Sequence, residues 1–375
     1  MTDFSTKCVH AGTITDKNFK GVNSPIYTST SYAYIDREDT VYPRYLNTPN
    51  EKSVAAKIAA LEGTETALVF SSGMAAISTT ILGMMNSGDH IVLQRGLYGG
   101  TTNFILSDLK RFGIEFTFAE SQQVEDIMAV VQPNTKLIYI ETPSNPLLNI
   151  TDMRAVAEKA KQAEIITIID NTFASPVNQQ PVIHGIDIII HSATKYIGGH
   201  SDICAGVVAT SSKLIDKIHK TGMNLGGSLN AITLYLVERS LKTLDVRVQR
   251  INKNAQSIAE FLVNHPAIKT VHYPGLPEHP GHMIARRQMT GFGGMLSFEL
   301  KNQDSIEFQK KLKLIKPSVS LGGVETIVTS PVHTSHRHLS DEDRRKEGIT
   351  DGLIRMSVGI ESSADLITDI DKALH

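Results

Sequence analysis

Residues 166–196 read ITIIDNTFASPVNQQPVIHGIDIIIHSATKY and decide the fold. Two β-branched runs, 166–170 and 187–194, each end in polar residues. Both runs are apolar throughout and do not alternate, which is typical of parallel strands buried on both faces of a sheet. This stretch therefore predicts two central strands of an α/β sheet, with polar side chains following each strand.

The same rhythm continues on both sides of this stretch. Further strands are expected at 66–70, 90–94, 114–119, 136–142 and 205–210. Helices are expected over 51–62, 74–85 and 99–112, and the first of them ends before Gly63. About seven strands alternating with helices indicate a doubly wound α/β domain with a mostly parallel sheet.

The alternation of strands and helices is lost toward both ends of the chain, so we predict that the chain has three parts. Residues 1–50 carry Gly, Pro and several Tyr without a sustained period, and we interpret them as an irregular arm that packs on a neighbouring subunit. Residues 51–245 form the α/β domain. Residues 246–375 form a smaller α+β domain, with strands expected near 271–275, 293–301, 317–321 and 353–361.

The amino-acid composition excludes several classes of protein. The chain has 375 residues, 41% hydrophobic and 20% charged, with a net charge of −2. These values exclude a disordered, collagen-like or disulfide-rich chain and give no electrostatic footprint for nucleic acid. No secretion signal and no apolar run of about 18 residues are found, so we expect a cytoplasmic protein that binds no membrane. Cys8 is uninformative, and Cys204 is interpreted as a small buried apolar residue.

Polar residues follow four of the predicted strands. They are Ser71–Met74, Pro143–Pro146, Asp170 with Asn171, and Ser192–Lys195. Ligands of open α/β sheets bind at the carboxyl ends of the strands, so these segments are expected to converge on one pocket. An amine at Lys195 and a carboxylate at Asp170 suit pyridoxal phosphate (PLP), which is held as a Schiff base and needs an acidic partner for its ring nitrogen.

Several motifs resemble those of one enzyme family. SSGMAA (71–76), YGGT (98–101), ETPSNP (141–146), DNTFASP (170–176), SATKYIGGHSD (192–202), VSLGGVET (319–326) and RMSVGIE (355–361) resemble the trans-sulfuration family of PLP-dependent enzymes. The resemblance implies fold type I, as in aspartate aminotransferase. The family includes methionine γ-lyase, cystathionine γ-synthase, cystathionine γ- and β-lyases, and O-acetylhomoserine sulfhydrylase.

The resemblance also implies a role for individual residues. Lys195 would hold PLP as a covalent aldimine and shuttle protons, Asp170 would pair with the pyridine nitrogen, and Tyr98 would stack on the ring. The cofactor phosphate would be held by Gly73, Met74, Ser192 and Thr194, and by Tyr42 and Arg44 of a neighbouring subunit. The substrate α-carboxylate would be bound by Asn145, Ser320 and Arg355. Shared sites require at least a homodimer, and the family suggests a homotetramer.

Two positions depart from the family pattern and bear on substrate choice. Members that handle cystathionine tend to have Arg where this chain has Asn103, and Glu where it has Val319. A neutral and an apolar residue suit a short apolar side chain, so α,γ-elimination from a methionine-like substrate is favoured. Gly100 is counter-evidence, because many methionine γ-lyases carry Cys there.

Other functions stay open at this point. The chain could be a γ-replacement transferase (cystathionine γ-synthase or O-acetylhomoserine sulfhydrylase), or a cystathionine γ- or β-lyase. From a different class, it could be a PLP-binding regulator with little turnover. His333, His336 and His338 lie close in sequence, but their spacing fits no standard metal-ligand pattern, so no metal is expected.

Overall fold

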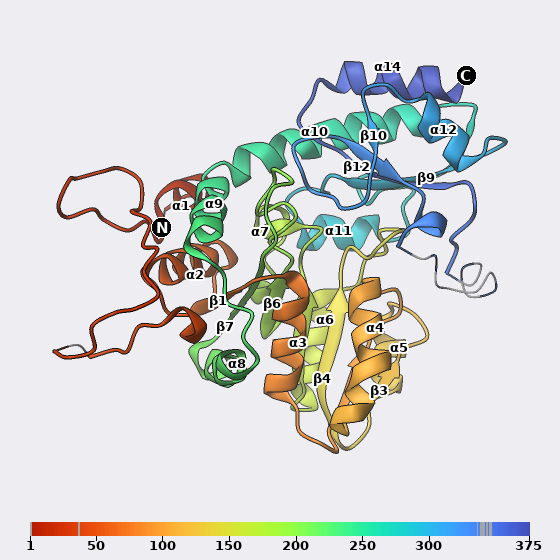
Figure 1. Ribbon diagram of the computed structural model, residues 1–375. Coiled ribbons are helices and arrows are strands. Elements are labelled where there is room, and N and C mark those ends of the chain that lie inside the picture. The colour runs from red at the N-terminus through yellow and green to blue at the C-terminus, as the bar shows by residue number, and fades with distance from the viewer. Residues whose placement is uncertain (1, 37, 336, 338–341, 343, 345–346) are drawn as a thin grey trace.

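The computed structural model describes residues 2–36, 38–335, 337, 342, 344 and 347–375. It contains a seven-stranded sheet and a five-stranded sheet, each covered by helices (Figure 1). A long helix, α10 (Leu244–Val263), runs from the first sheet to the second. Within the described ranges, no helix is long and apolar enough to cross a membrane.

The seven-stranded sheet has the order β1-β7-β6-β5-β4-β2-β3. Its strands are β1 (Thr66–Phe70), β2 (His90–Leu93), β3 (Glu115–Phe118), β4 (Thr135–Glu141), β5 (Ile166–Asp170), β6 (Ile188–His191) and β7 (Gly206–Thr210). Strands β2 to β6 pair in parallel, whereas β7 is antiparallel to both β1 and β6. The predicted strands and the mostly parallel sheet are confirmed. The antiparallel β7 brings its first residue to the edge where the parallel strands end.

Helices cover both faces of this sheet. One face carries α2 (Pro49–Glu62), α5 (Val124–Ala129) and α6 (Met153–Gln162), and the other carries α3 (Gly73–Met84), α4 (Gly99–Asp108) and α8 (Ser212–Leu225). Along β1, Ala67 and Val69 pack toward the first set, and Leu68 and Phe70 toward the second. This alternation explains the continuous apolar runs of the inner strands, because both faces of those strands are buried.

Local sequence sets where the helices begin. Helix α2 starts at Pro49 rather than at 51, because Thr48 caps it and forms a capping box with Glu51. Helix α3 starts at Gly73, and the side chain of Ser72 accepts a hydrogen bond from the backbone N–H of Ala75 at 3.0 Å. The helix predicted over 99–112 is α-helical only to Asp108, and a 3₁₀ turn follows over Leu109–Phe112.

The C-terminal sheet has the order β10-β11-β12-β9-β8. Its strands are β8 (Ile268–His272), β9 (Met295–Leu300), β10 (Lys316–Pro317), β11 (Ile327–Thr329) and β12 (Leu353–Ser357). Helices α10, α12 (Ser305–Lys311) and α14 (Ser363–Leu374) pack against it. The strand predicted over 317–321 is wrong beyond Pro317, because the chain turns away at Ser320, where φ is 85°. Sequence reasoning also missed β11, which is only three residues long.

The two cores meet along α10. Its first half, with Leu244, Val248 and Ile251, packs into the core of the large sheet, and its second half, with Ile258 and Leu262, packs into the C-terminal core. The helical stretch before it is a separate helix, α9 (Ala231–Leu241). The division expected at 245/246 thus falls in the first turn of a helix that both cores share, and it stays a prediction.

Short elements complete the chain. They are the helices α7 (Ser175–Asn178) and α11 (His282–Gln288), and the 3₁₀ turns η1 (Pro43–Tyr45), η3 (Pro181–His184) and η4 (Pro331–His333). The expectation of an arm without regular structure is wrong for residues 4–10, which form α1 (Phe4–His10) against α2 and α10.

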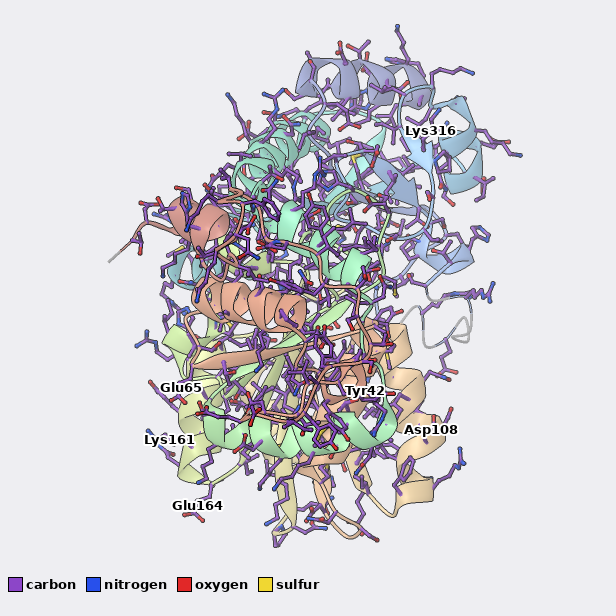
Figure 2. All side chains as sticks on the ribbon, turned by 60° about the vertical axis from the view of Figure 1, so that its left-hand side comes forward. Tyr42, Glu65, Asp108, Lys161, Glu164 and Lys316 are labelled. Atoms are coloured by element: carbon purple, nitrogen blue, oxygen red, sulfur yellow. The ribbon has the colours of Figure 1, made fainter. Side chains whose placement is uncertain are left out.

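The rest of the arm leaves the body of the molecule in extended loops (Figure 1). Large apolar side chains stand exposed on it, with Phe19 at 90%, Val22 at 90% and Tyr34 at 75% of full exposure. Tyr42 lies next to α8 (Figure 2), where Arg44 donates a hydrogen bond to the carbonyl of Met223. Packing on a neighbouring subunit stays a prediction for this arm.

Candidate active site

A pocket of about 640 Å³ opens at the edge where the parallel strands end. Its walls come from the segments that follow β1, β2, β4, β5 and β6, from the residues before β7, and from the loop after β10 and strand β12 of the other sheet. Parallel strands end at a common edge, so residues far apart in sequence meet there. The pocket therefore belongs to both sheets.

Most of the residues that the sequence singled out line this one pocket: Gly73, Met74, Tyr98, Asn145, Asp170, Ser192, Thr194, Lys195, Val319, Ser320 and Arg355. Tyr42, Arg44 and Asn103 lie outside its lining. Asn103 is exposed on α4, and its side-chain oxygen accepts a hydrogen bond from Ser107 Oγ at 3.4 Å. The guanidinium of Arg44 lies over the ring of Tyr45, 5.1 Å from its centroid. The roles expected for these three residues stay predictions.

Lys195 carries an amine whose surroundings favour the neutral form. Its Nζ donates a hydrogen bond to Ser320 Oγ at 2.7 Å. Burial lowers the pKa of Lys195, and the nearby charge of Arg355 lowers it further, against weaker opposing effects of Cys204 and Asp170. A neutral amine is the form that attacks a carbonyl or accepts a proton.

Asp170 lies at the end of β5 with its carboxylate buried. Its Oδ1 accepts a hydrogen bond from the backbone N–H of Thr172 at 3.0 Å. Burial raises the pKa of Asp170, whereas the hydrogen bonds from Thr172 and the positive charges of His191 and Lys195 lower it. A cationic ring nitrogen placed against this carboxylate would be stabilised by it.

Arg355, from β12, has a guanidinium whose hydrogen-bond donors do not all have an acceptor among the described residues. Its Nη1 donates to Asn145 Oδ1 at 2.9 Å, and its Nη2 donates to the carbonyl of Ser320 at 3.1 Å. Its Nε is buried and has no hydrogen-bond partner among the described residues. Burial also lowers the pKa of Arg355 to about 10. A buried donor without a partner costs about 1–3 kcal/mol, so this group is suited to bind a carboxylate.

The start of α3 forms a cradle for an anion. The first N–H groups of a helix have no acceptor within the helix, and Gly73 and Met74 hold these positions. A Cβ on Gly73 would lie 2.8 Å from Ser192 Cβ, so only glycine lets these segments approach so closely. Thr194 lies beside them, and its hydroxyl donates to the carbonyl of Ala205 at 3.2 Å. Residues for a phosphate, a ring nitrogen and an aldehyde therefore surround one pocket, and together they fit PLP.

Tyr98 lies on the pocket wall with 47% of its surface exposed. Its backbone N–H donates to Glu141 Oε2 at 2.8 Å. Glu141 is buried, and burial together with the charge of Asp170 raises its pKa well above the ordinary range. Sequence reasoning missed Glu141, although a signal was present: it ends β4 as Asp170 ends β5, and the two are paired in register.

Cys204 corrects another expectation. It is exposed and lines the pocket, not buried as a small apolar residue. The reason is the antiparallel direction of β7, since the residues before an antiparallel strand lie at the edge where the parallel strands end. His333 also lines the pocket, while His336 and His338 lie outside the described residues.

A different group of possible metal ligands occurs at the end of the chain. Ligand atoms of His265, Asp371 and His375 lie within 4.8 Å of one another. However, His265 Nδ1 accepts a hydrogen bond from the backbone N–H of Ala267 at 3.2 Å, so its Nε2 carries the hydrogen. That Nε2 lies 3.3 Å from Asp371 Oδ1. A ring nitrogen that carries a hydrogen does not ligate a metal, so this group is interpreted as a His–Asp ion contact.

The fold and the pocket together define a class. A doubly wound sheet with an amine, a carboxylate and a helix start converging at one edge is that of a PLP-dependent enzyme of fold type I. Comparison with known proteins then gives the family. Residues 5–375 match a protein family described as "Cys/Met metabolism PLP-dependent enzyme", and the chain belongs to that family.

Individual relatives match over nearly their whole length. Cystathionine gamma-lyase of Bacillus subtilis is 44% identical over 374 residues, which are 99% of this chain and 98% of that protein. L-methionine gamma-lyase of Fusobacterium nucleatum is 40% identical over 387 residues, covering 99% and 97%. The crystal structure of cystathionine gamma-lyase from Lactobacillus plantarum with L-serine superposes with a TM-score of 0.95 at 38% identity, covering 99% and 98%. The predicted cofactor and the predicted class, a PLP-dependent carbon–sulfur lyase, are confirmed at the level of the family.

Proposed function

We propose that this enzyme cleaves the Cγ–S bond of a methionine-like amino acid by α,γ-elimination, consuming water and releasing a thiol, 2-oxobutanoate and ammonia. The observation that supports this substrate is Val319, next to Ser320 in the pocket lining and 65% exposed. Its isopropyl group offers an apolar contact for the distal end of a substrate. A charged tail would lose its hydration there without gaining a partner from this residue.

Binding of the amino acid begins at its α-carboxylate. The unpartnered Nε of Arg355 supports this role, because a carboxylate supplies the acceptor that it lacks. Asn145 holds the guanidinium in place through its side-chain oxygen. Ser320, which contacts both Arg355 and Lys195, brings the carboxylate site next to the amine.

PLP, when bound, supplies an electron sink that stabilises negative charge on the substrate carbons. Gly73, Met74, Ser192 and Thr194 would hold its phosphate, Asp170 its ring nitrogen and Lys195 its aldehyde carbon. Asp170 is itself buried, which strengthens its contact with a cation.

Proton transfers fall to Lys195 and Tyr98. The lowered pKa of Lys195 favours an amine that removes the proton from Cα and then one from Cβ. The Tyr98 side chain lies in the same pocket and would donate a proton to the departing sulfur at Cγ. Glu141 acts on Tyr98 through its backbone N–H, and so helps to position the ring.

A second candidate follows from other residues of the pocket lining. His333 and Arg337 line it, and a cationic side chain there would suit a substrate with an anionic distal group. Cystathionine has such a group, and so has a succinyl ester of homoserine. This observation favours a cystathionine γ- or β-lyase, or cystathionine γ-synthase, as the alternative. O-acetylhomoserine sulfhydrylase is a further alternative that this observation does not favour, because the acetyl ester is uncharged at its distal end.

The active unit proposed here is at least a homodimer, and a homotetramer by analogy with the family. The exposed apolar side chains of the arm support this, because monomers rarely leave such residues uncovered. Tyr42 and Arg44 would then reach the cofactor phosphate in the neighbouring subunit.

The test is to supply the PLP-loaded enzyme separately with L-methionine, L-cystathionine and O-acetyl-L-homoserine, with and without added thiol, and to identify each 2-oxo acid. Release of 2-oxobutanoate from methionine without added thiol is the expected result. Turnover confined to the ester plus thiol would make the enzyme a transferase. Pyruvate from cystathionine would make it a β-lyase.

A further inference from the structure

A buried contact between a glutamate and a histidine lies behind the pocket and takes no part in the steps above. Glu62 ends α2 with 0% exposure, and His191 ends β6 with 1%. His191 Nε2 contacts Glu62 Oε1. Asn171 Nδ2 donates to the same oxygen at 3.2 Å, while Glu62 Oε2 is buried without a hydrogen-bond partner among the described residues.

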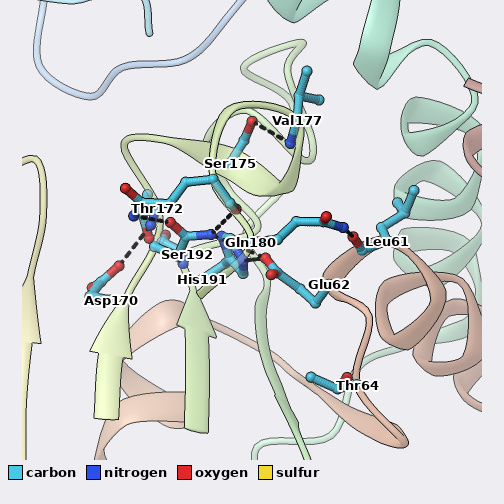
Figure 3. A network of polar contacts seen from close by, with 12 residues as sticks. Leu61, Glu62, Thr64, Asp170, Thr172, Ser175, Val177, Gln180, His191 and Ser192 are labelled. Carbon is cyan, nitrogen blue, oxygen red and sulfur yellow. Dashed lines mark hydrogen bonds and ion pairs between the residues drawn. The ribbon is translucent and has the colours of Figure 1, made fainter. Parts of the chain in front are cut away.

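The pair contacts the ends of β5 and β6, the two strands that are followed by or end in residues of the proposed chemistry. Asn171 directly follows Asp170, and His191 directly precedes Ser192. Above them Thr172 joins the same two strand ends, because its N–H donates to Asp170 Oδ1 at 3.0 Å and its Oγ1 accepts from the N–H of Ser192 at 2.8 Å. Figure 3 shows Glu62 reaching from α2 to this junction, with Asp170 on its far side.

Such a pair is expensive to bury. Removing two charged groups from water costs several kcal/mol each, and apolar residues of similar size often stabilise a fold equally well. Its position next to Asp170 gives it an electrostatic effect that apolar residues would lack. Burial raises the pKa of Asp170, and the positive charge of His191 acts in the opposite direction.

We propose that Glu62 and His191 form a positioning pair, which keeps Asp170 ionised and aligned with the ring nitrogen of bound PLP. Neither residue lines the pocket. The other charged groups that act on Asp170 are Lys195 and Glu141, and Glu141 is paired with Asp170 in register on β4. A positive charge on His191 would favour the anionic form of Asp170. The inference rests on the role proposed for Asp170 above.

Glu62→Gln and His191→Gln test this pair, because each keeps a polar group of similar reach and removes the charge. His90→Gln is the matched control: His90 is also fully buried, but it begins β2 at the opposite edge of the sheet, where it contacts Thr135 and Thr117. For each protein we would measure the affinity of the apoenzyme for PLP from the change in visible absorption, and the pH profile of kcat/KM.

Both pair variants are expected to bind PLP about tenfold more weakly and to lose activity at a pH about one unit higher on the acid side than the wild type. The double variant should resemble the single variants, since either change alone breaks the contact between the two side chains. His90→Gln should alter thermal stability only. Wild-type PLP affinity and an unmoved acid limb in both pair variants would overturn the proposal and leave the pair a purely structural one.

Two further variants keep the outcome clear. Glu62→Asp retains the charge but shortens the side chain. It should therefore shift the acid limb of the pH profile less than Glu62→Gln does, while still weakening PLP binding. A wild-type acid limb together with wild-type PLP affinity in Glu62→Asp would count against the pair even if the Gln variants do not fold. Asp170→Asn, measured in parallel, separates the two proposals. Unchanged PLP binding and turnover in Asp170→Asn would refute the role of Asp170 itself.

Discussion

Lys195 Nζ donates a hydrogen bond to Ser320 Oγ at 2.7 Å, although 125 residues separate the two along the chain. Lys195 follows β6 of the seven-stranded sheet, and Ser320 lies between β10 and β11 of the other sheet. Ser320 has a φ of 85°, a conformation that costs about 1–3 kcal/mol for a residue with a side chain. In this conformation its hydroxyl faces Lys195, and its carbonyl accepts a hydrogen bond from Arg355. The site therefore depends on how the two sheets are packed together.

Replacing Lys195 by Ala should remove both the covalent link to PLP and the base. We expect kcat to fall by about 10³-fold or more. Borohydride reduction followed by mass spectrometry should find the cofactor attached to a peptide containing residue 195 in the wild type and to no peptide in the variant. Lys269→Ala, which alters an exposed lysine paired with Glu299, is the control and should behave as wild type. Attachment of the cofactor to another lysine would refute the assignment.

Arg355→Lys should weaken substrate binding more than chemistry. A lysine cannot reproduce the fork that contacts Asn145 and Ser320 and still offers a donor to a carboxylate. The KM for the amino acid should rise by about 10–100-fold, with a smaller change in kcat. Steady-state kinetics measure this, and Arg287→Lys on the surface is the control. An unchanged KM would place the α-carboxylate elsewhere.

Val319→Glu should redirect specificity toward substrates with a distal ammonium group. The side chain is exposed in the pocket lining, so a carboxylate there remains hydrated and costs little in stability. We expect the ratio of kcat/KM for cystathionine to that for methionine to rise by about tenfold. Assays with both substrates on the same preparation check this. A constant ratio would mean that position 319 does not contact the distal group.

Gly73→Ala should damage the phosphate cradle. The added methyl group would lie 2.8 Å from Ser192 Cβ, so α3 and the segment after β6 must move apart. PLP affinity should fall by about tenfold or more, as measured by titration of the apoenzyme. Gly83→Ala, near the other end of the same helix, is the control, because its nearest contact would be 3.1 Å and lies away from the pocket. Equal PLP affinity in the two variants would argue against the cradle.

Glu51→Gln should change how stability depends on pH. Burial raises the pKa of Glu51 from its ordinary 4.5 to about 7, against the opposing hydrogen bonds from Thr48. The folded state thus binds this proton more tightly than the unfolded chain. The resulting stabilisation is fully present below pH 4.5 and is lost as the pH rises through 7. The decrease in the free energy of unfolding between pH 4.5 and pH 8 should be about 2–4 kcal/mol smaller in the variant than in the wild type, as measured by urea unfolding. An identical pH dependence would show that the carboxyl stays ionised.

Much of the site could be predicted from the sequence, because its residues follow strands that are themselves easy to recognise. Asp170, Lys195 and the turn at Gly73 each come directly after or beside an apolar run, and parallel strands bring their carboxyl ends to one edge. Glu141 carried the same signal and was overlooked. Cys204 could not be found in this way, since nothing local to the sequence reveals that β7 runs antiparallel to its neighbours.

The sequence by itself determined the α/β class, most of the strand positions and the polar segments that line one pocket, because apolar periodicity and the polar ends of strands are local properties of the chain. Only the tertiary structure decided which residues of the C-terminal part complete the pocket. Ser320 and Arg355 reach Lys195 and Asn145 through the packing of one sheet on the other. The pairing of Glu62 with His191 is likewise a contact between a helix end and a strand end 129 residues apart. Such contacts depend on the sum of packing over both cores, and no local pattern encodes them.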